Sequence, residues 1–160
     1  MWTLFNEGWG QFETAQNLAM LQAQDQTRVV DANSGWFDQG VGDFDSHHIY
    51  FGKIRLKNEK RRALLLSECG GYTLRVKDHA YSEKSFGYRK FNRGDDLAKA
   101  IYELYTKQII PLIAKEGLCG SVFTQLSDVE TEMNGLITYD REIIKVDSSV
   151  MRAINDKLVF

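Results

Sequence analysis

Residues 2–10 read WTLFNEGWG. An apolar and aromatic run of strand length ends here at Asn6 and Glu7, and two glycines then allow the backbone to turn away beside Trp9. The pattern predicts a buried strand that carries a carboxylate at its carboxyl end.

The same pattern recurs at residues 63–71, which read ALLLSECGG. A continuous aliphatic run is expected for a strand that is buried on both faces, as in a parallel sheet. This run ends in Glu68, again followed by glycines. Paired carboxylates at the ends of parallel strands are suited to cleaving glycosidic bonds, with one as proton donor and the other as nucleophile or base.

The composition is that of one domain with few special features. The 160 residues contain 20 Lys and Arg against 22 Asp and Glu, for a formal net charge of −2. No basic cluster is interleaved with aromatics, and charge interrupts every apolar segment before a bilayer could be spanned, so neither a nucleic acid nor a membrane is expected as a partner. Cys69 and Cys119 are expected on different strands, without a disulfide between them.

The first residues show no secretory leader, because a buried-type strand begins at the second residue. We interpret the chain as a piece of a larger protein. Its compartment stays open between cytoplasmic, periplasmic and secreted.

Helical and strand patterns alternate along the chain, which favours a parallel sheet with working loops at the carboxyl ends of its strands. The basic segment 53–62 is interpreted as a solvated connection. Besides the two strands above, we expect helices at 12–24, 95–117 and 148–157, strands at 29–32, 48–51 and 121–126, and loops at 33–45, 72–92 and 128–134. In the helix at 95–117, Asp95 or Asp96 is the expected cap, Pro111 the expected bend and Gly117 the expected end.

The chain resembles the second half of the (β/α)8 catalytic domain of family 2 glycoside hydrolases, the group of β-galactosidases, β-glucuronidases and β-mannosidases. The most specific elements are Asn6-Glu7, the run Glu68-Cys69-Gly70-Gly71, and residues 135–141, which read GLITYDR. The resemblance implies an α/β fold of mostly parallel strands, about strands 4 to 8 of a TIM barrel, as one domain over residues 1–160. It also implies preceding β-domains that this sequence does not contain.

By this resemblance, Glu7 is the general acid/base and Glu68 the nucleophile of a retaining mechanism, which needs carboxylates about 5 to 5.5 Å apart. Asn6 would bind the sugar's 2-hydroxyl, and Tyr50 would touch the nucleophile. Glu7 needs a raised pKa, for which Trp9 and the aromatic loops could supply desolvation, whereas Glu68 needs hydrogen-bond donors to stay ionised.

Other candidates are left with two interpretations each. His48 and Gln125 are candidates for lining the sugar pocket. His47 and His48 lack the spacing of a metal site, so neither metal nor cofactor is expected. Four aromatic residues could be sugar-stacking platforms or loop packing, namely Trp36, Phe37, Tyr72 and Tyr88.

Two positions depart from the family pattern. Thr124 stands where members often place a tryptophan as the floor of the sugar site. Residues 132–134 read EMN where β-glucuronidases carry an Asn-x-Lys that binds a uronic acid, and an acidic Glu132 would repel that carboxylate. A neutral sugar is therefore expected, with β-galactosides first.

The sequence thus predicts a fragment of a retaining exo-β-glycosidase that acts on terminal β-linked sugars. The alternatives are a β-glucuronidase or β-mannosidase, an endo-acting glycanase, and a non-catalytic carbohydrate-binding fragment. Half a barrel leaves two strand edges unpaired, so we expect the isolated piece to be inactive and either to dimerise through these edges or to be covered by further segments.

Overall fold

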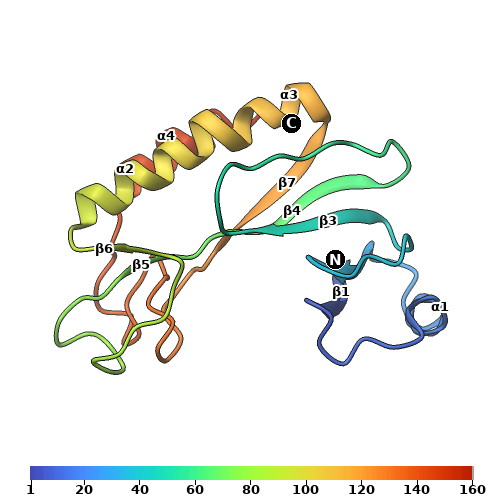
Figure 1. The fold of residues 1–160 in the computed structure, drawn as a ribbon, viewed down its shortest axis with the longest axis horizontal. Coiled ribbons are helices and arrows are strands. Elements are labelled where there is room, and N and C mark those ends of the chain that lie inside the picture. Colours follow the sequence, from blue (N-terminus) through green and yellow to red (C-terminus); the bar gives the residue numbers. More distant parts are fainter. Residues whose placement is uncertain (160) are drawn as a thin grey trace.

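The computed structural model describes residues 1–159 as a mixed α/β structure (Figure 1). The elements in chain order are β1 (Trp2–Asn6), α1 (Thr14–Gln24), β2 (Val30–Ser34), β3 (Phe44–Ile49), β4 (Ala63–Gly70), β5 (Tyr72–Leu74), β6 (Arg89–Phe91), α2 (Gly94–Leu104), the π-helical turn η1 (Tyr105–Ile109), α3 (Ile110–Glu116), β7 (Leu118–Thr124) and α4 (Ser148–Asn155).

Every pairing between the named strands is parallel. β1 pairs with β2, β4 lies between β3 and β7, and β5 pairs with β6 in a small separate sheet. β2 also packs along β3. Because parallel strands end at the same edge of a sheet, the residues that follow β1, β3 and β4 come together there.

The main core lies between β4 and the helices that follow it in the chain. Leu64 and Leu66 of β4 have no exposed surface, and they pack with Ile101 of α2 and Ile109 of η1. Figure 1 shows α2 and α3 running along one side of β4 and β7. The aliphatic run of residues 64–66 is therefore buried as its pattern predicted. A second, smaller core forms where Leu18 of α1 packs against β2.

The loop expected at 33–45 is shorter than predicted. β2 extends to Ser34, and β3 begins at Phe44 and ends at Ile49, so the prediction of a strand over 48–51 was wrong by four residues at its start. Asp45 and Ser46 are buried although they are polar. The strand was not predicted because its buried residues are polar and form hydrogen bonds. Such residues give no alternating hydrophobic pattern in the sequence.

The loop expected at 72–92 contains two short strands. β5 and β6 pair in parallel, with Tyr72 opposite Arg89 and Leu74 opposite Phe91. Three residues are too few to show an alternating pattern, so the prediction of a continuous loop was wrong at both of its ends.

The helix expected at 95–117 is divided into α2, η1 and α3. Arg93, not Asp95 or Asp96, occupies the position before α2, and the two aspartates lie in its first turn, where negative charge is favoured by the helix dipole. The α-helical hydrogen-bonding pattern of α2 changes to the π-helical turn η1 ahead of Pro111, which lies in the first turn of α3. Gly117 ends α3 in the left-handed conformation, with φ of 70°, which confirms the predicted stop.

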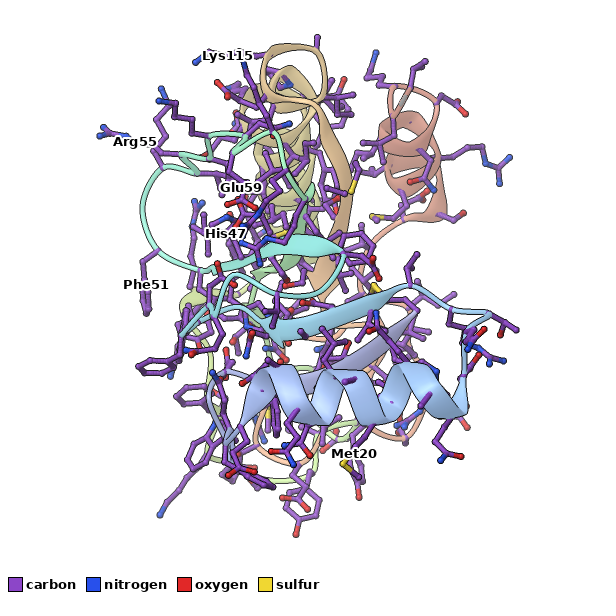
Figure 2. The ribbon with its side chains drawn as sticks, turned by 90° about the vertical axis from the view of Figure 1, so that its right-hand side faces the viewer. Met20, His47, Phe51, Arg55, Glu59 and Lys115 are labelled. Carbon is purple, nitrogen blue, oxygen red and sulfur yellow. The ribbon has the colours of Figure 1, made fainter. Side chains whose placement is uncertain are left out.

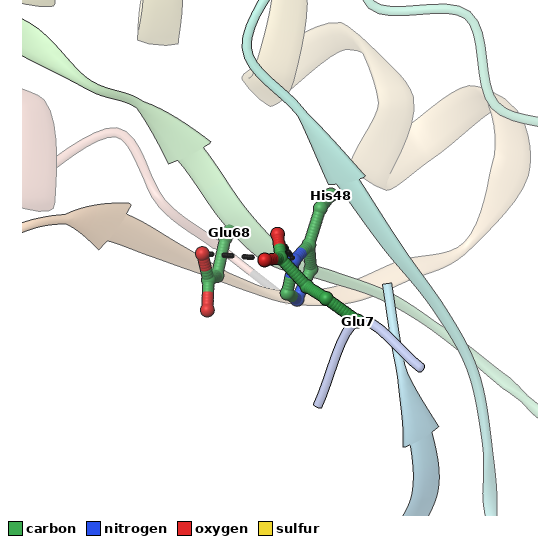
Figure 3. Close-up of side chains that lie close together, drawn as sticks. All are labelled: Glu7, His48 and Glu68. Atoms are coloured by element: carbon green, nitrogen blue, oxygen red, sulfur yellow. Dashed lines mark hydrogen bonds and ion pairs between the residues drawn. The ribbon is translucent and has the colours of Figure 1, made fainter. Parts of the chain in front are cut away.

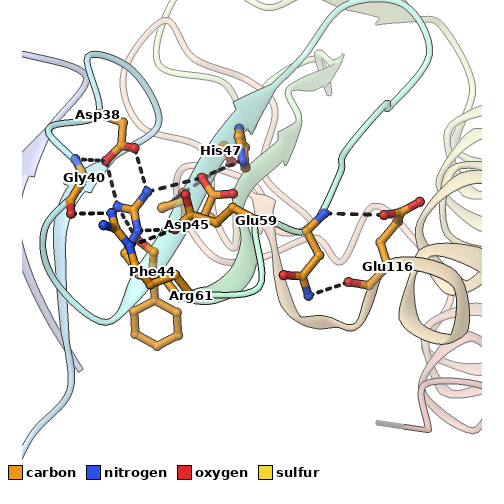
Figure 4. A network of polar contacts seen from close by, with 12 residues as sticks. Asp38, Gly40, Phe44, Asp45, His47, Glu59, Arg61 and Glu116 are labelled. Carbon is orange, nitrogen blue, oxygen red and sulfur yellow. Dashed lines mark hydrogen bonds and ion pairs between the residues drawn. The ribbon is translucent and has the colours of Figure 1, made fainter.

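The basic segment 53–62 is a connection in which every lysine and every arginine except Arg62 is exposed, as predicted, but it is not solvated throughout. Ile54 and Leu56 are buried in the main core. Arg62 is buried as well, and its guanidinium donates to both carboxylate oxygens of Asp38, at 2.8 and 2.6 Å, and to Glu59 at 2.6 Å (Figure 4). One paired arginine therefore joins the loop after β2 to the start of β4.

The remaining boundaries differ from the predicted ones by a few residues. α4 ends at Asn155, and the Asp147 carboxylate caps it by accepting from the backbone N–H of Ser149 at 2.7 Å. Cys69 and Cys119 are both free, as expected. Within residues 1–159, no helix combines the length and the apolar character needed to cross a bilayer.

Candidate functional site

Three side chains from different strands meet at the carboxyl edge of the sheet. Glu7 follows β1, His48 lies near the end of β3, and Glu68 lies near the end of β4 (Figure 3). One oxygen or nitrogen atom of each residue lies within 4.8 Å of one such atom of the other two. The two glutamates that the sequence analysis singled out, 61 positions apart, are thus neighbours in the fold.

The backbone of each strand fixes how these side chains point. The N–H of Glu7 donates to the carbonyl oxygen of Ser34 at 2.9 Å, and Glu7 has a positive φ of 54°, which is costly for a residue with a side chain. The register between β3 and β4 shifts at His47 and His48, so that His48 stands opposite Glu68. Irregularities of this kind change the direction of a side chain next to functional sites.

His48 is the contact between the two carboxylates. Its Nδ1 lies 2.8 Å from Oε1 of Glu7 and 3.6 Å from Oε2 of Glu68. On the other side of the ring, Nε2 lies 2.9 Å from Oγ of Ser34. The side chain has 0% exposed surface, although His48 borders the cavity described below, so a sugar contact by His48 stays a prediction. Its position orients Glu7.

Tyr50 follows β3, and its phenol donates a hydrogen bond to the Glu68 carboxylate. The ring of Tyr88 stacks on that of Tyr50, with centroids 4.2 Å apart and planes 17° apart. Burial, and secondly the hydrogen bond to Glu68, raise the pKa of Tyr50 well above its usual value. The phenol therefore remains a donor at neutral pH.

The other predicted site residues lie farther from this contact. Asn6 ends β1 and is exposed. Trp9 is 79% exposed, and its part in desolvating Glu7 stays a prediction. Gln125 donates from Nε2 to Oδ1 of Asn134 at 2.6 Å, which ties it to the loop after β7 and not to the two glutamates.

The aromatic candidates divide into packing and open surface. Tyr72 packs against Phe91 and Phe123 beside the main core, so loop packing is its role. Phe37 is 68% exposed. Trp36 and Tyr88, however, border a cavity of about 250 Å³ next to the catalytic candidates, together with His48, Ile49, Tyr50 and Phe51. Figure 2 shows Phe51 projecting outward from the loop after β3.

The same three residues could also hold a metal ion. Glu7, His48 and Glu68 offer one ligand atom each, which the linear spacing of the histidines did not predict. Two ligands of one zinc ion, each about 2.0–2.2 Å from it, stand about 3.3 Å apart in tetrahedral geometry. The 2.8 Å between His48 and Glu7 is instead the length of a hydrogen bond.

Sequence reasoning missed a group of polar side chains beneath the site. Asp31, Ser34, Ser46 and Ser67 are all buried. Asp31 lies between Val30 and Ala32, and Ser67 follows Leu66, so a polar residue within an apolar run is the signal that could have revealed these two. Ser34 and Ser46 have polar or glycine neighbours and give no such signal.

No protein-family model matches the chain, and no curated protein is a match for it. The functional argument below is therefore made from the geometry and chemistry of these residues.

Proposed function

We propose that the chain is the half of a glycoside hydrolase barrel that carries both catalytic carboxylates of a retaining exo-β-glycosidase. The observation that carries the proposal is the approach of Glu7 and Glu68 to within 4.8 Å between one oxygen of each. Retaining enzymes need their carboxyl groups about 5–5.5 Å apart, whereas inverting enzymes leave about 6.5–9.5 Å for a water molecule. The short separation favours the retaining reaction.

In the first step, an oxygen of Glu68 attacks the anomeric carbon as the bond from that carbon to the glycosidic oxygen breaks. Glu7 gives its proton to the departing oxygen, which leaves as an alcohol. In the second step, Glu7 takes a proton from water, and the water oxygen displaces Glu68 from the anomeric carbon. The sugar leaves with its original configuration and both glutamates return to their starting states.

Two neighbours support this division of roles. The phenol of Tyr50 donates to Glu68, which favours the ionised carboxylate that a nucleophile needs. Glu7 contacts the imidazole of His48, which can accept a hydrogen bond from the protonated acid or donate one to the ionised base. Glu7 alternates between these two states during the reaction.

The strand arrangement supports a (β/α)8 barrel with about strands 4 to 8 supplied by this chain. β1 pairs with β2 in parallel, β3, β4 and β7 form a second parallel sheet, β2 packs along β3, and α2 and α3 run along one side of β4 and β7. A barrel of eight strands requires three more, between β7 and β1. Within residues 1–159, β1 pairs only with β2 and β7 only with β4, so both outer edges are available to a preceding segment or to a second copy.

The proposed substrate is a terminal β-linked neutral sugar, with β-galactosides first. Met133 and Asn134 are buried, whereas Glu132 beside them is exposed. A carboxylate at that position repels the carboxylate of a uronic acid, which disfavours the β-glucuronidase alternative. β-Mannosides remain the second candidate within the same reaction.

The test uses the complete barrel, formed by the chain together with the polypeptide that supplies the three remaining strands. Glu7→Gln and Glu68→Gln should each lower turnover of aryl β-galactosides by at least about 10³-fold while sugar binding is kept. Glu103→Gln, which changes a partly exposed carboxylate of α2 outside the pair, is the matched control and should keep turnover.

Other outcomes would identify the rival functions. Sugar binding without turnover by the unchanged protein would indicate a non-catalytic binding module. Cleavage of polysaccharide with no action on aryl monosaccharides would indicate an endo-acting glycanase. Turnover that survives both glutamine variants would overturn the proposal.

A further inference from the structure

A continuous series of hydrogen bonds runs beneath the candidate site and ends at a carboxyl group that the reaction above does not use. It starts at Asp31 in β2 and passes through three serines, which we call the hydroxyl chain, and then through His48 to Glu7. The consecutive distances are 2.8 Å from Asp31 Oδ2 to Ser46 Oγ, 2.6 Å from Ser46 to Ser67, 3.0 Å from Ser67 to Ser34, 2.9 Å from Ser34 to His48 Nε2, and 2.8 Å from His48 Nδ1 to Glu7 Oε1.

The series is closed off from solvent over most of its length. Asp31 is 0% exposed and the members of the hydroxyl chain are 4–7% exposed. Oδ1 of Asp31 has no hydrogen-bond partner within residues 1–159, so this carboxyl group depends on Ser46 for its one strong side-chain contact. Burial raises the pKa of Asp31 above its usual value, against the effect of the hydrogen bond from Ser46.

The number of hydrogens allows two matching orientations of this series. Each serine hydroxyl has one hydrogen and donates one hydrogen bond, and a neutral imidazole donates from one nitrogen and accepts at the other. When Asp31 is protonated, every group donates toward Glu7, so His48 accepts at Nε2 and donates from Nδ1. When Glu7 is protonated instead, every group donates toward Asp31, and His48 is the other tautomer.

We propose that Asp31 and Glu7 exchange a proton through the hydroxyl chain and His48, so that Asp31 is an internal proton store for the catalytic acid. In one direction, the O–H bond of Asp31 breaks and each hydroxyl passes its own hydrogen to the next oxygen. His48 gains a hydrogen at Nε2 and gives up the one at Nδ1, and an O–H bond forms on Glu7. The atoms balance without any external reagent, and His48 is neutral before and after.

This inference rests on the proposed function, because only an acid/base role of Glu7 gives the proton exchange a purpose. Glu7 must be protonated when the leaving oxygen departs and ionised when water attacks. A store joined to Glu7 from below supplies the proton for the first step and takes up the proton released in the second. The route runs through buried groups and needs no contact with solvent. Asp31 and the serines are positioning residues here, because they act on Glu7 only through His48.

The exchange can be tested on the 160-residue chain without any substrate, by nuclear magnetic resonance. The carboxyl carbon of Asp31 and the two ring nitrogens of His48 are followed from pH 3 to 9. Glu7→Gln should move the titration midpoint of Asp31 by about one pH unit, because two coupled groups titrate as a pair. The tautomer of His48 should change together with Asp31.

The matched pair Ser67→Ala and Ser67→Thr isolates the hydroxyl chain from direct electrostatic effects. Alanine removes the hydroxyl that joins the two halves of the chain, whereas threonine keeps it. The other titratable groups that face the two carboxyls, namely His48, Glu68, Tyr50 and Tyr88, are unchanged in both. Most of the effect of Glu7→Gln on Asp31 should be lost with alanine and kept with threonine. If the alanine variant does not fold, Ser34→Ala and Ser34→Thr make the same comparison one position nearer His48.

An equal effect in the alanine and threonine backgrounds would overturn the proton exchange. In the complete barrel, Asp31→Asn should lower kcat/KM about tenfold for a glycoside with a poor leaving group and leave an activated aryl glycoside nearly unchanged, because only the first needs the acid. Equal losses for both glycosides, or none, would also overturn it. Absence of all turnover in the unchanged protein would instead refute the proposed function, and the magnetic resonance comparison would still decide the exchange.

Discussion

The phenol of Tyr50 donates a hydrogen bond to the carboxylate of Glu68 across the parallel strands β3 and β4. The contact depends on the register between β3 and β4, which sets His48 opposite Glu68. Tyr50 lies two residues after His48, just past the last paired residue of β3. Stacking by Tyr88 holds the phenol in place. This relationship gives the first prediction.

Tyr50→Phe should keep the fold and lower kcat/KM of the complete barrel by about 10- to 100-fold, because one hydrogen bond to a charged group contributes about 1.5–3 kcal/mol. Loss of the donor removes a hydrogen bond that stabilises the anionic carboxylate, so the decrease in kcat/KM should appear across the pH–rate profile. Tyr81→Phe, a similar change at an exposed tyrosine, is the control. An unchanged profile would show that Tyr50 does not support the nucleophile.

Removal of metal ions should leave turnover unchanged. His48 and Glu7 approach each other to the length of a hydrogen bond, which is closer than two ligands of a single zinc ion. Dialysis against a chelator, followed by metal analysis and assay of the complete barrel, tests this expectation. Loss of activity that returns with one divalent ion would assign the Glu7, His48 and Glu68 set to a metal.

The contact between Arg62 and Asp38 should make the stability of the chain depend on pH. The hydrogen bonds from Arg62 hold the pKa of Asp38 below its usual value, so their contribution is complete above the unfolded-state pKa of about 4 and is lost as pH falls below it. Asp38 is 41% exposed, and solvent screening limits the contribution to about 1 kcal/mol.

Urea unfolding of Asp38→Asn and of the unchanged chain at a series of pH values measures this contribution. The difference in the free energy of unfolding should be constant above about pH 5 and should close below about pH 4. Glu142→Gln, at an exposed side chain with no ion pair among residues 1–159, should show no such difference. A gap that widens toward low pH would contradict the prediction.

Lys145 and Asp128 form a buried ion pair, with Nζ and Oδ1 2.6 Å apart and side chains 0% and 1% exposed. Lys145→Met should lower the free energy of unfolding by about 3–5 kcal/mol, because it leaves a carboxylate buried without its partner. Adding Asp128→Asn should recover a large part of that loss. A double-mutant cycle by urea unfolding gives the coupling energy, and additive losses would show that the two residues are independent.

The sequence predicted the positions of Glu7 and Glu68 at strand ends, but it did not predict the start of β3. The difference has a physical reason. Glu68 ends a continuous aliphatic run, and Glu7 ends an aromatic one, so both were visible where an apolar run stops. The prediction that the strand before Glu7 is buried was wrong, because no residue of β1 is fully buried within residues 1–159. Asp45 and Ser46 lie in β3 without an apolar pattern, because their partners are other polar groups. Hydrogen bonds made across strands leave no periodic trace in a sequence.

The sequence by itself determined the parallel α/β character, the buried run of β4, the end of α3 at Gly117, and the two carboxylates that end β1 and β4. These features follow from local rules of periodicity, helix termination and turn formation, which involve residues close together along the chain. Only the tertiary structure decided that Glu7 and Glu68 approach each other through His48, that His48 is covered, and that Asp31 is joined to Glu7 by three serines. These relationships depend on the register between strands far apart in the sequence, and a shift of one residue would point every one of these side chains to the opposite face.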